Sequence, residues 1–260
     1  MVTPPERRLS FNEVPDIYDE IRPSYPGELF NLLFQMLPSA PVIVEVGPGT
    51  GQATRDLLAR GASVHAVEIG PATAAKLRQN LSSPSLRVSV GDFEAIELPR
   101  ASADAVFSAT AYHWISSPAR TDRPAFLLRP GGLVAIVDLI QVTDPADHGF
   151  FAAAQPIYEQ YGEGHRGPAS PARGDVDPAC RKEMDNDERF HLIDVRRWDW
   201  DQTYTAAEYH KLMLSYSGTQ MMAPALRLGL LDDMEALINS DFDGQITRPL
   251  VATLTAARLI

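Results

Sequence analysis

The feature that most constrains this chain is a short apolar run that leads directly into three alternating glycines. The run is Val42–Val46, and the glycines are Gly47, Gly49 and Gly51. Glycine has no Cβ and adopts positive φ readily, so a ligand can lie directly against its main chain. A strand, a glycine-rich turn and the start of a helix together form a nucleotide-sized cradle. The spacing departs from the dinucleotide fingerprint G-x-G-x-x-G, because Gln52 stands where that fingerprint has its third glycine.

A carboxylate follows each of the next two apolar runs. Glu68 ends the run at 63–67, and an ionised glutamate is a pure acceptor with two oxygens, which suits a pair of ribose hydroxyls. NAD-binding proteins share this feature, so it does not discriminate between cofactors. Asp92 and Phe93 follow the run at 86–90. A carboxylate next to an aromatic ring suits hydrogen bonding to an adenine amino group and cover for the adenine ring.

Apolar runs alternate with helical stretches through the first half of the chain. The expected strands are 42–46, 63–67, 86–90, 104–109 and 133–138, and the expected helices are about 52–60, 72–81 and 120–128. Such alternation predicts parallel strands that are buried on both faces. In the second half, Thr205 and Glu208 have capping-box spacing before a helix, Leu230 to Ile238 form an amphipathic stripe, and 251–259 is expected to be a strand.

Several motifs occur in one order along the chain. They are Glu45-x-Gly47-x-Gly49-x-Gly51, Glu68, Gly91-Asp92-Phe93 and Leu128-Arg129-Pro130-Gly131-Gly132. This series resembles the motifs of class I S-adenosylmethionine-dependent methyltransferases. Two more segments resemble the small-molecule branch of that family: Ala111-Tyr112-His113-Trp114, and Tyr18-x-x-x-Arg22-Pro23-x-Tyr25-Pro26. The resemblance covers roughly residues 11 to 143.

The resemblance implies an α/β fold with a Rossmann-like, doubly wound, mostly parallel seven-stranded sheet and flanking helices. An N-terminal helical lid and an insertion before the last strands belong to this expectation. The chain is then one methyltransferase domain over 1–260. Its expected parts are a lid segment at 1–41, a cofactor-binding core at 42–143, an insertion that covers the acceptor pocket at 144–230, and a C-terminal helix and strand at 231–260.

The implied activity is methyl transfer from S-adenosyl-L-methionine to a small organic acceptor, with S-adenosyl-L-homocysteine as the product. The aromatic content of residues 139–230 suits an apolar or aromatic acceptor. The implied cofactor-binding residues are Tyr18, Arg22, Glu45, Gly47, Gly49, Gly51, Glu68, Ile69, Asp92, Phe93 and Ala109. The six histidines show no metal-ligand spacing, so we expect no metal.

Two sequence features have two interpretations each. Tyr18 and Arg22 lie four apart in a helical pattern and can point the same way. They belong either to a lid over the methionine end of the cofactor or to an ordinary edge helix. His113 follows the fourth strand, where the acceptor would face the sulfonium. It is either a general base, since its ordinary pKa suits neutral pH, or a residue that shapes the pocket while Trp114 packs beside it.

The overall charge bears on the partners. Twenty-three Lys and Arg stand against 34 Asp and Glu, a formal charge of −11 with no block of like charge. This disfavours nucleic acid and anionic membranes, which attract clustered basic residues. Cys180 is the only cysteine, and neither a secretory signal nor an apolar run of spanning length is apparent. We therefore expect a cytoplasmic monomer or homodimer.

Two other functions remain open at this point. A nucleotide-cofactor oxidoreductase would require a degenerate glycine loop, and the Tyr-x-x-x-Lys pair typical of one such class is missing from the sequence. A non-catalytic cofactor-binding protein would keep the glycine loop and both carboxylates without performing chemistry.

Overall fold

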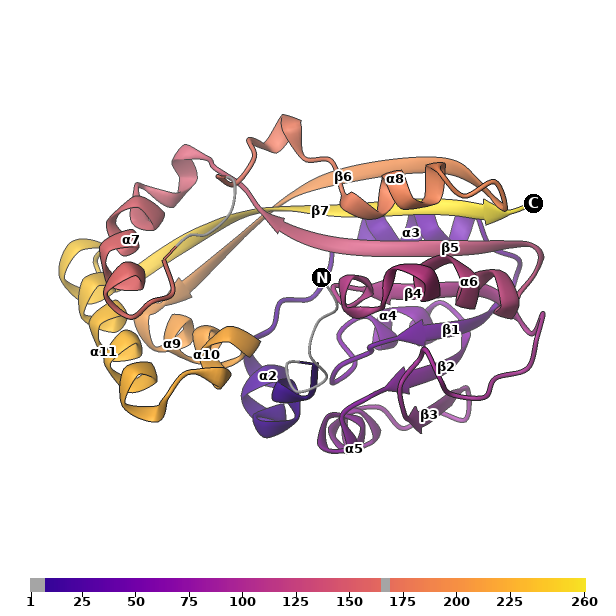
Figure 1. Ribbon diagram of the computed structural model, residues 1–260, viewed down its shortest axis with the longest axis horizontal. Helices are drawn as coiled ribbons and strands as arrows, with labels where there is room; N and C mark the ends of the chain where they lie inside the picture. The colour runs from indigo at the N-terminus through magenta and orange to yellow at the C-terminus, as the bar shows by residue number, and fades with distance from the viewer. Residues whose placement is uncertain (1–7, 165–168) are drawn as a thin grey trace.

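The computed structural model describes residues 8–164 and 169–260. Residues 1–7 of the expected lid segment, and 165–168 of the expected insertion, lie outside the described residues. The chain forms a seven-stranded sheet in the order β3-β2-β1-β4-β5-β7-β6. β1 to β5 are mutually parallel, and β7 is antiparallel to both β5 and β6. The predicted fold class, a mostly parallel seven-stranded sheet with flanking helices, is confirmed (Figure 1).

The elements have the following bounds. The strands are β1 (Val42–Val46), β2 (Ser63–Glu68), β3 (Leu86–Val90), β4 (Ala103–Ala109), β5 (Leu128–Gln141), β6 (Phe190–Thr205) and β7 (Gln245–Leu259). The α-helices are α2 (Pro15–Ile21), α3 (Gly27–Gln35), α4 (Thr54–Ala59), α5 (Pro71–Asn80), α6 (Ser117–Leu127), α7 (Phe150–Gln160), α8 (Ala179–Asp185), α9 (Ala206–Leu214), α10 (Ser217–Met221) and α11 (Pro224–Asp241). Short 3₁₀ turns include η1 (Ser10–Glu13) and η2 (Tyr112–Trp114).

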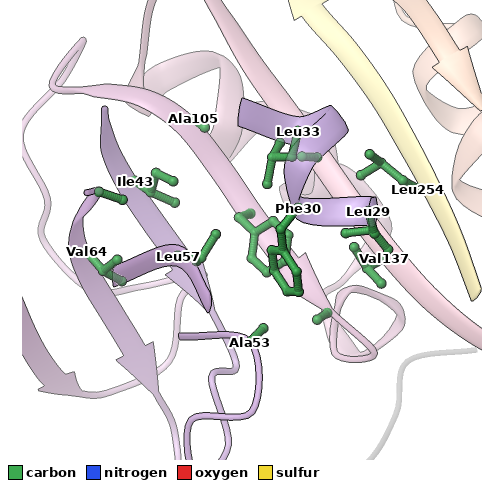
Figure 2. Close-up of a cluster of buried hydrophobic side chains, with 14 of the residues drawn as sticks. Leu29, Phe30, Leu33, Ile43, Ala53, Leu57, Val64, Ala105, Val137 and Leu254 are labelled. Carbon is green, nitrogen blue, oxygen red and sulfur yellow. The ribbon is translucent and has the colours of Figure 1, made fainter. Parts of the chain in front are cut away.

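Alternating side chains of the central strands build a core on each face of the sheet. Ile43 packs into one cluster with Phe30 of α3 and Phe107 of β4, and both phenylalanines are fully buried (Figure 2). Val44, the next residue of β1, packs into the cluster on the opposite face, where α6 and α8 contribute Leu127 and other apolar side chains. Burial on both faces explains why β1 reads as a continuous apolar run.

The fifth strand differs from the sequence expectation at its start. The strand expected at 133–138 begins five residues earlier, at Leu128, and includes Arg129 to Gly132. In this segment the pairing of β5 with β4 shifts register between Ala103↔Leu128 and Ala105↔Leu133. Gly131 has φ +75°, a conformation that glycine adopts readily at a β-bulge.

The range expected to be an insertion contains part of the sheet. β6 crosses residues 190–205 and forms an edge of the sheet, paired along its whole length with β7. The material that covers the carboxyl ends of the strands therefore comes in two pieces, one before β6 and one between β6 and β7. Charged residues on β6, such as Arg196 with a side chain 61% exposed, protect this long edge from pairing with another chain.

The second piece forms a helical group at one end of the molecule. α9 and α11 lie beside α7 and the adjoining ends of β6 and β7, with α2 between this group and the sheet (Figure 1). Thr205 and Glu208 form the predicted capping box at the start of α9. Leu230, Met234 and Ile238 of the predicted stripe are buried in the cluster beneath α11. Across the described ranges, helices long and apolar enough to cross a membrane are absent.

Candidate functional site

A cavity of about 570 Å³ lies at the carboxyl ends of the parallel strands. Its volume is within the usual range for small-molecule sites. Ligands bind at this edge in open α/β sheets because the loops that leave the strands diverge there. Every predicted cofactor residue except Glu45 and Gly51 lines this cavity, and so does His113. The lining members of the predicted set are Tyr18, Arg22, Gly47, Gly49, Glu68, Ile69, Asp92, Phe93 and Ala109.

The three glycines of the loop serve different purposes. All have positive φ: +64° at Gly47, +60° at Gly49 and +107° at Gly51. A Cβ on Gly47 would lie 2.5 Å from the Ala111 Cβ, and one on Gly51 would lie 2.7 Å from a Leu77 methyl. These two glycines permit close packing against the loop after β4 and against α5. A Cβ on Gly49 would instead meet Tyr18 at 3.2 Å, at the wall of the cavity.

Glu68 ends β2 with its carboxylate held by backbone amides. Gly49 N donates to one carboxylate oxygen at 3.1 Å, and Gly70 N donates to the other at 2.9 Å. Burial raises the pKa of Glu68 to about 7 against the lowering effect of these amides. Each oxygen keeps a second lone pair, so the carboxylate can accept two hydroxyl protons at the same time. This is the acceptor pattern that a ribose diol needs.

Glu45 lies beneath the glycine loop and not in its wall. Its side chain is 1% exposed and accepts a hydrogen bond from Thr54 Oγ1 at 2.7 Å. Burial raises the pKa of Glu45 to about 8. The bond ties β1 to the start of α4, on either side of the glycine loop. Its geometry is that of a residue that positions the loop.

Asp92 makes an ion pair that the sequence did not indicate. Arg8 Nη2 lies 3.1 Å from Asp92 Oδ2, and Arg8 Nη1 lies 3.3 Å from Glu94 Oε1. Both Arg8 and Asp92 line the cavity. The Asp92 side chain is 32% exposed, so a ligand can reach it. Nothing in the sequence near Arg8 marks it, because the contact spans 84 residues.

Aromatic rings close the cavity above the glycine loop. Phe11 lies between Tyr18 and Trp114, with ring centroids 5.8 Å from each and edge-to-face geometry. Tyr18 comes from α2, Phe11 from η1 and Trp114 from η2, so the contact joins the N-terminal segment to the loop after β4. Phe11 stands at the start of the predicted lid, but no motif singles it out.

Arg22 follows α2 and connects the lid to the C-terminal helices. Its guanidinium carbon lies 4.8 Å from the ring centroids of both Tyr18 and Tyr216. One of its nitrogens donates to the Ser215 carbonyl at 2.8 Å. Arg22 therefore links α2 to the segment that follows α9.

If the N-terminal segment is a lid over the cofactor, S-adenosylhomocysteine should protect it. We expect saturating ligand to slow amide hydrogen exchange in residues 11–26 and in the Gly47–Gly51 loop together, because closure orders both. Exchange should be followed by mass spectrometry, with α8, which lies away from the cavity, as the internal control. Protection of the loop alone would make α2 an ordinary packing helix.

The fourth strand continues into a residue with a strained backbone. Thr110 follows β4 with φ +55°, unusual for a β-branched side chain, and its amide donates to the Val137 carbonyl at 2.7 Å. Its hydroxyl lies 3.1 Å from Tyr25 Oη. Tyr25 comes from the Arg22-Pro23-x-Tyr25-Pro26 motif, so that motif supports the loop after β4 at the cavity wall.

His113 is exposed at the cavity rim, next to Trp114 with ring centroids 4.9 Å apart. Desolvation, and then the Arg120 guanidinium, lower the pKa of His113 below its ordinary value. Arg120 donates to the backbone carbonyl of His113 at 3.0 Å. Within 8–164 and 169–260, no side chain hydrogen-bonds its imidazole. The ring therefore lacks the orienting partner that a general base commonly has.

The cavity continues past the lid into a second region. This part is lined from α7, α9, α10, α11 and the start of β7, by Tyr158, Leu212, Met213, Tyr216, Leu230, Arg248 and Leu250 among others. Of the aromatic residues that the sequence offered for an acceptor pocket, Tyr158 and Tyr216 line it, whereas Phe150 is fully buried in the core.

The residues present fit S-adenosylmethionine. A Cβ on Gly49 would project to where the loop main chain meets Tyr18. Glu68 has two free lone pairs for a diol. Asp92 offers a hydrogen-bond acceptor next to the ring of Phe93. Arg22 offers a cation at the lid, suited to a methionine carboxylate. All of these groups line the same cavity.

Comparisons with known proteins agree with this geometry. The model of a family described as a methyltransferase domain matches residues 44–136. An uncharacterised methyltransferase of Mycobacterium tuberculosis is 38% identical over 130 residues, which are 50% of this chain and 51% of that protein. The chain therefore matches only about half the length of this curated relative.

Two solved structures share the fold. One from Anaeromyxobacter dehalogenans, described as a type II methyltransferase, is 21% identical with a TM-score of 0.60 and covers 91% of this chain and 96% of that one. A phosphoethanolamine N-methyltransferase of Haemonchus contortus, solved with S-adenosylhomocysteine, is 16% identical with a TM-score of 0.51 and covers 95% of this chain and 57% of that one. Motif order, sheet topology and the match at residues 44–136 agree that this part of the chain is similar to a methyltransferase domain.

Proposed function

We propose that this protein transfers a methyl group from S-adenosylmethionine to a small organic acceptor. The observation that carries the proposal is the single cavity with two differently lined regions. Glu68, Asp92 and the glycine loop line one region, and side chains from the C-terminal helices line the other. A cofactor and a small acceptor can therefore meet in one cavity.

The character of the second region supports an apolar or aromatic acceptor body. Leu212, Met213, Leu230 and Leu250 supply aliphatic surface, and Tyr158 and Tyr216 supply rings. Residues from α9, α10 and α11 cover this region, which favours a small molecule over a nucleic-acid strand. Burial of apolar surface contributes about 25 cal/mol per Å² to binding such a body.

The chemistry asks the protein for alignment and for exclusion of water. When bound, the sulfonium supplies an activated methyl group. The residues of this chain would hold the two molecules in line, which alone can supply a large share of the rate. The lid residues Phe11, Tyr18 and Arg22 would keep water from the attacking atom. This division of roles leaves few residues that must act chemically.

His113 is expected to shape the pocket without acting as a base. Because the described residues leave its imidazole without an orienting partner, His113→Asn should keep most of the turnover, while a general base would lose about 10²- to 10⁴-fold in rate. The rate should be measured across pH 5.5–9 with saturating cofactor, with Asn compared against Ala. A loss of that size in His113→Asn, with unchanged S-adenosylhomocysteine affinity, would make His113 the base.

The proposed function itself is tested in two steps. Calorimetry should show S-adenosylhomocysteine binding, with NADH as the matched nucleotide control. A screen of small organic acceptors with methyl-labelled S-adenosylmethionine should then yield a product heavier by one labelled methyl group. Binding of NADH in place of S-adenosylhomocysteine would favour the oxidoreductase alternative. Cofactor binding without transfer to any acceptor would favour the non-catalytic one.

A further inference from the structure

Arg248 enters the acceptor region from the start of β7. It lines the cavity with Tyr158, Tyr216 and Leu250. One Nη donates to Tyr216 Oη at 2.7 Å, and the other donates to Gln141 Oε1 at 2.8 Å. Its guanidinium carbon also lies 5.9 Å from the Tyr216 ring centroid. Packing and hydrogen bonds thus hold this cation in a fixed orientation.

The groups around Arg248 do not neutralise its charge. In the described part of the chain it makes no ion pair with a carboxylate, and its two hydrogen-bond partners are a phenol and an amide. Burial raises the pKa of Tyr204 to about 12 and that of Tyr209 well above its usual range, so these neighbours are uncharged near neutral pH. Glu163 also lines the cavity, but it is exposed, and its carboxylate lies beside Gly218 at the start of α10.

One donor of Arg248 has no partner. Its Nε is inaccessible to solvent, and no described residue hydrogen-bonds it. An arginine has five N–H donors, of which the bonds to Tyr216 and Gln141 use two. The remaining donors include Nε, which forms one arm of the fork that grips two oxygens of a carboxylate or phosphate.

A half-buried cation without a counter-ion is costly to keep. Desolvating the Arg248 guanidinium costs free energy that a neutral side chain at the same place would not cost, so another interaction must compensate for it. The bonds to Tyr216 and Gln141 do not require a full charge, because a neutral donor could make them. An incoming anion would pair the charge.

The order of contacts also places this cation relative to the cofactor. Tyr18 packs at Gly49, Arg22 stacks between Tyr18 and Tyr216, and Tyr216 contacts Arg248. Arg22 is thus next to the glycine loop, where a methionine carboxylate would lie, whereas Arg248 is two contacts further into the acceptor region. The two cations therefore occupy different places along the cavity, although both lie beside Tyr216.

We infer that the acceptor is an organic anion and that Arg248 binds its carboxylate or phosphate group. This inference rests on the proposed function and adds the substrate class. The anion is gripped at Arg248 while the apolar body lies along Leu212, Met213 and Leu230 towards the cofactor. Arg248 determines which acceptors are accepted and takes no part in cofactor binding.

The test measures a preference for anions. Benzoate, butyrate and phenyl phosphate should be titrated against benzamide and butyramide, with S-adenosylhomocysteine present. Calorimetry and the Arg248 Nε–H resonance report binding. We expect the anions to bind more tightly than the amides by about tenfold to a hundredfold, the range for a hydrogen bond to a charged group. A stronger response to benzoate identifies a carboxylate, and a stronger response to phenyl phosphate identifies a phosphate.

Two variants separate this role from a structural one. Arg248→Gln should abolish the preference and leave S-adenosylhomocysteine affinity unchanged, whereas Arg196→Gln, an exposed arginine on β6, should change neither. Arg248→Met should unfold at the same or a higher temperature, because it removes an uncompensated charge. Equal binding of anions and amides, no response of the Nε–H to any anion, or a lower unfolding temperature of Arg248→Met would overturn the inference. Failure of the unmodified protein to bind S-adenosylhomocysteine would instead overturn the proposed function.

Discussion

Replacement of Glu68 by alanine is expected to weaken S-adenosylhomocysteine binding by about 2–3 kcal/mol, measured by calorimetry on the folded variant. The reason is geometric. Backbone amides of Gly49 and Gly70 hold the two carboxylate oxygens, so both free lone pairs point to fixed places. Two charge-assisted hydrogen bonds to a diol, each of about 1.5 kcal/mol or more, are lost together. Glu97→Ala, which removes an exposed carboxylate, is the matched control and should bind normally.

The same residue should make binding depend on pH. Because the pKa of Glu68 is raised to about 7, the ionised acceptor is depleted below neutral pH. Affinity should therefore fall as pH decreases through 7, by up to about tenfold per pH unit, and level off above pH 8. Glu68→Gln should remove this dependence. A pH-independent affinity for the unmodified protein, or normal binding by Glu68→Ala, would place the ribose elsewhere.

The raised pKa of Glu68 makes the stability of the ligand-free protein fall as pH rises, whereas the affinity for the ligand increases. The folded state holds a proton on Glu68 at pH values where the unfolded chain has released it. From about pH 4.5 to 7, the folded state thus binds more protons, and this group's contribution to stability falls as pH rises. Glu45, with its pKa raised to about 8, acts in the same direction up to a higher pH. Burying the Glu68 carboxylate at this site therefore costs stability at pH values where Glu68 is ionised in the unfolded chain.

The cofactor wall could be predicted from the sequence because its residues are local. β1 and β3 have the predicted bounds, 42–46 and 86–90, since both are short, largely apolar runs that end at a glycine, Gly47 and Gly91. Glu68 ends β2 and Asp92 lies two residues after β3, and parallel strands bring their carboxyl ends to one edge. Once the order of the strands is known, position along each strand is enough to place these side chains together.

The acceptor region could not be predicted in this way. β6 spans 16 residues, but its edge position leaves an irregular mixture of charged and aromatic side chains in place of an apolar run. Arg248 lies in a strand segment between Thr247 and Pro249 with no motif around it. Its contacts to Gln141 and Tyr216 span 107 and 32 residues. Only the three-dimensional arrangement shows that its charge lacks a partner.

A second large effect is expected in the core beneath the site. Phe107→Ala should lower the free energy of unfolding by about 3–5 kcal/mol, the usual cost of removing a fully buried phenylalanine and leaving a cavity. Phe107 is 0% exposed and lies 6.2 Å, centroid to centroid, from Phe30 of α3. Both residues belong to the buried cluster on that face of the sheet, in which Figure 2 labels Phe30.

Urea denaturation followed by circular dichroism measures this loss, and Phe126→Ala is the matched control. Phe126 is 40% exposed on α6, so its removal should cost less than about 1 kcal/mol. Phe107 stands on β4 two residues before Ala109, which lines the cavity, so the variant also tests how strongly the core supports the site. If saturating S-adenosylhomocysteine raises the stability of Phe107→Ala as much as that of the unmodified protein, the cofactor wall is intact and the core contributes stability alone. A loss below 1 kcal/mol in Phe107→Ala would mean that the helix α3 face packs loosely against β4.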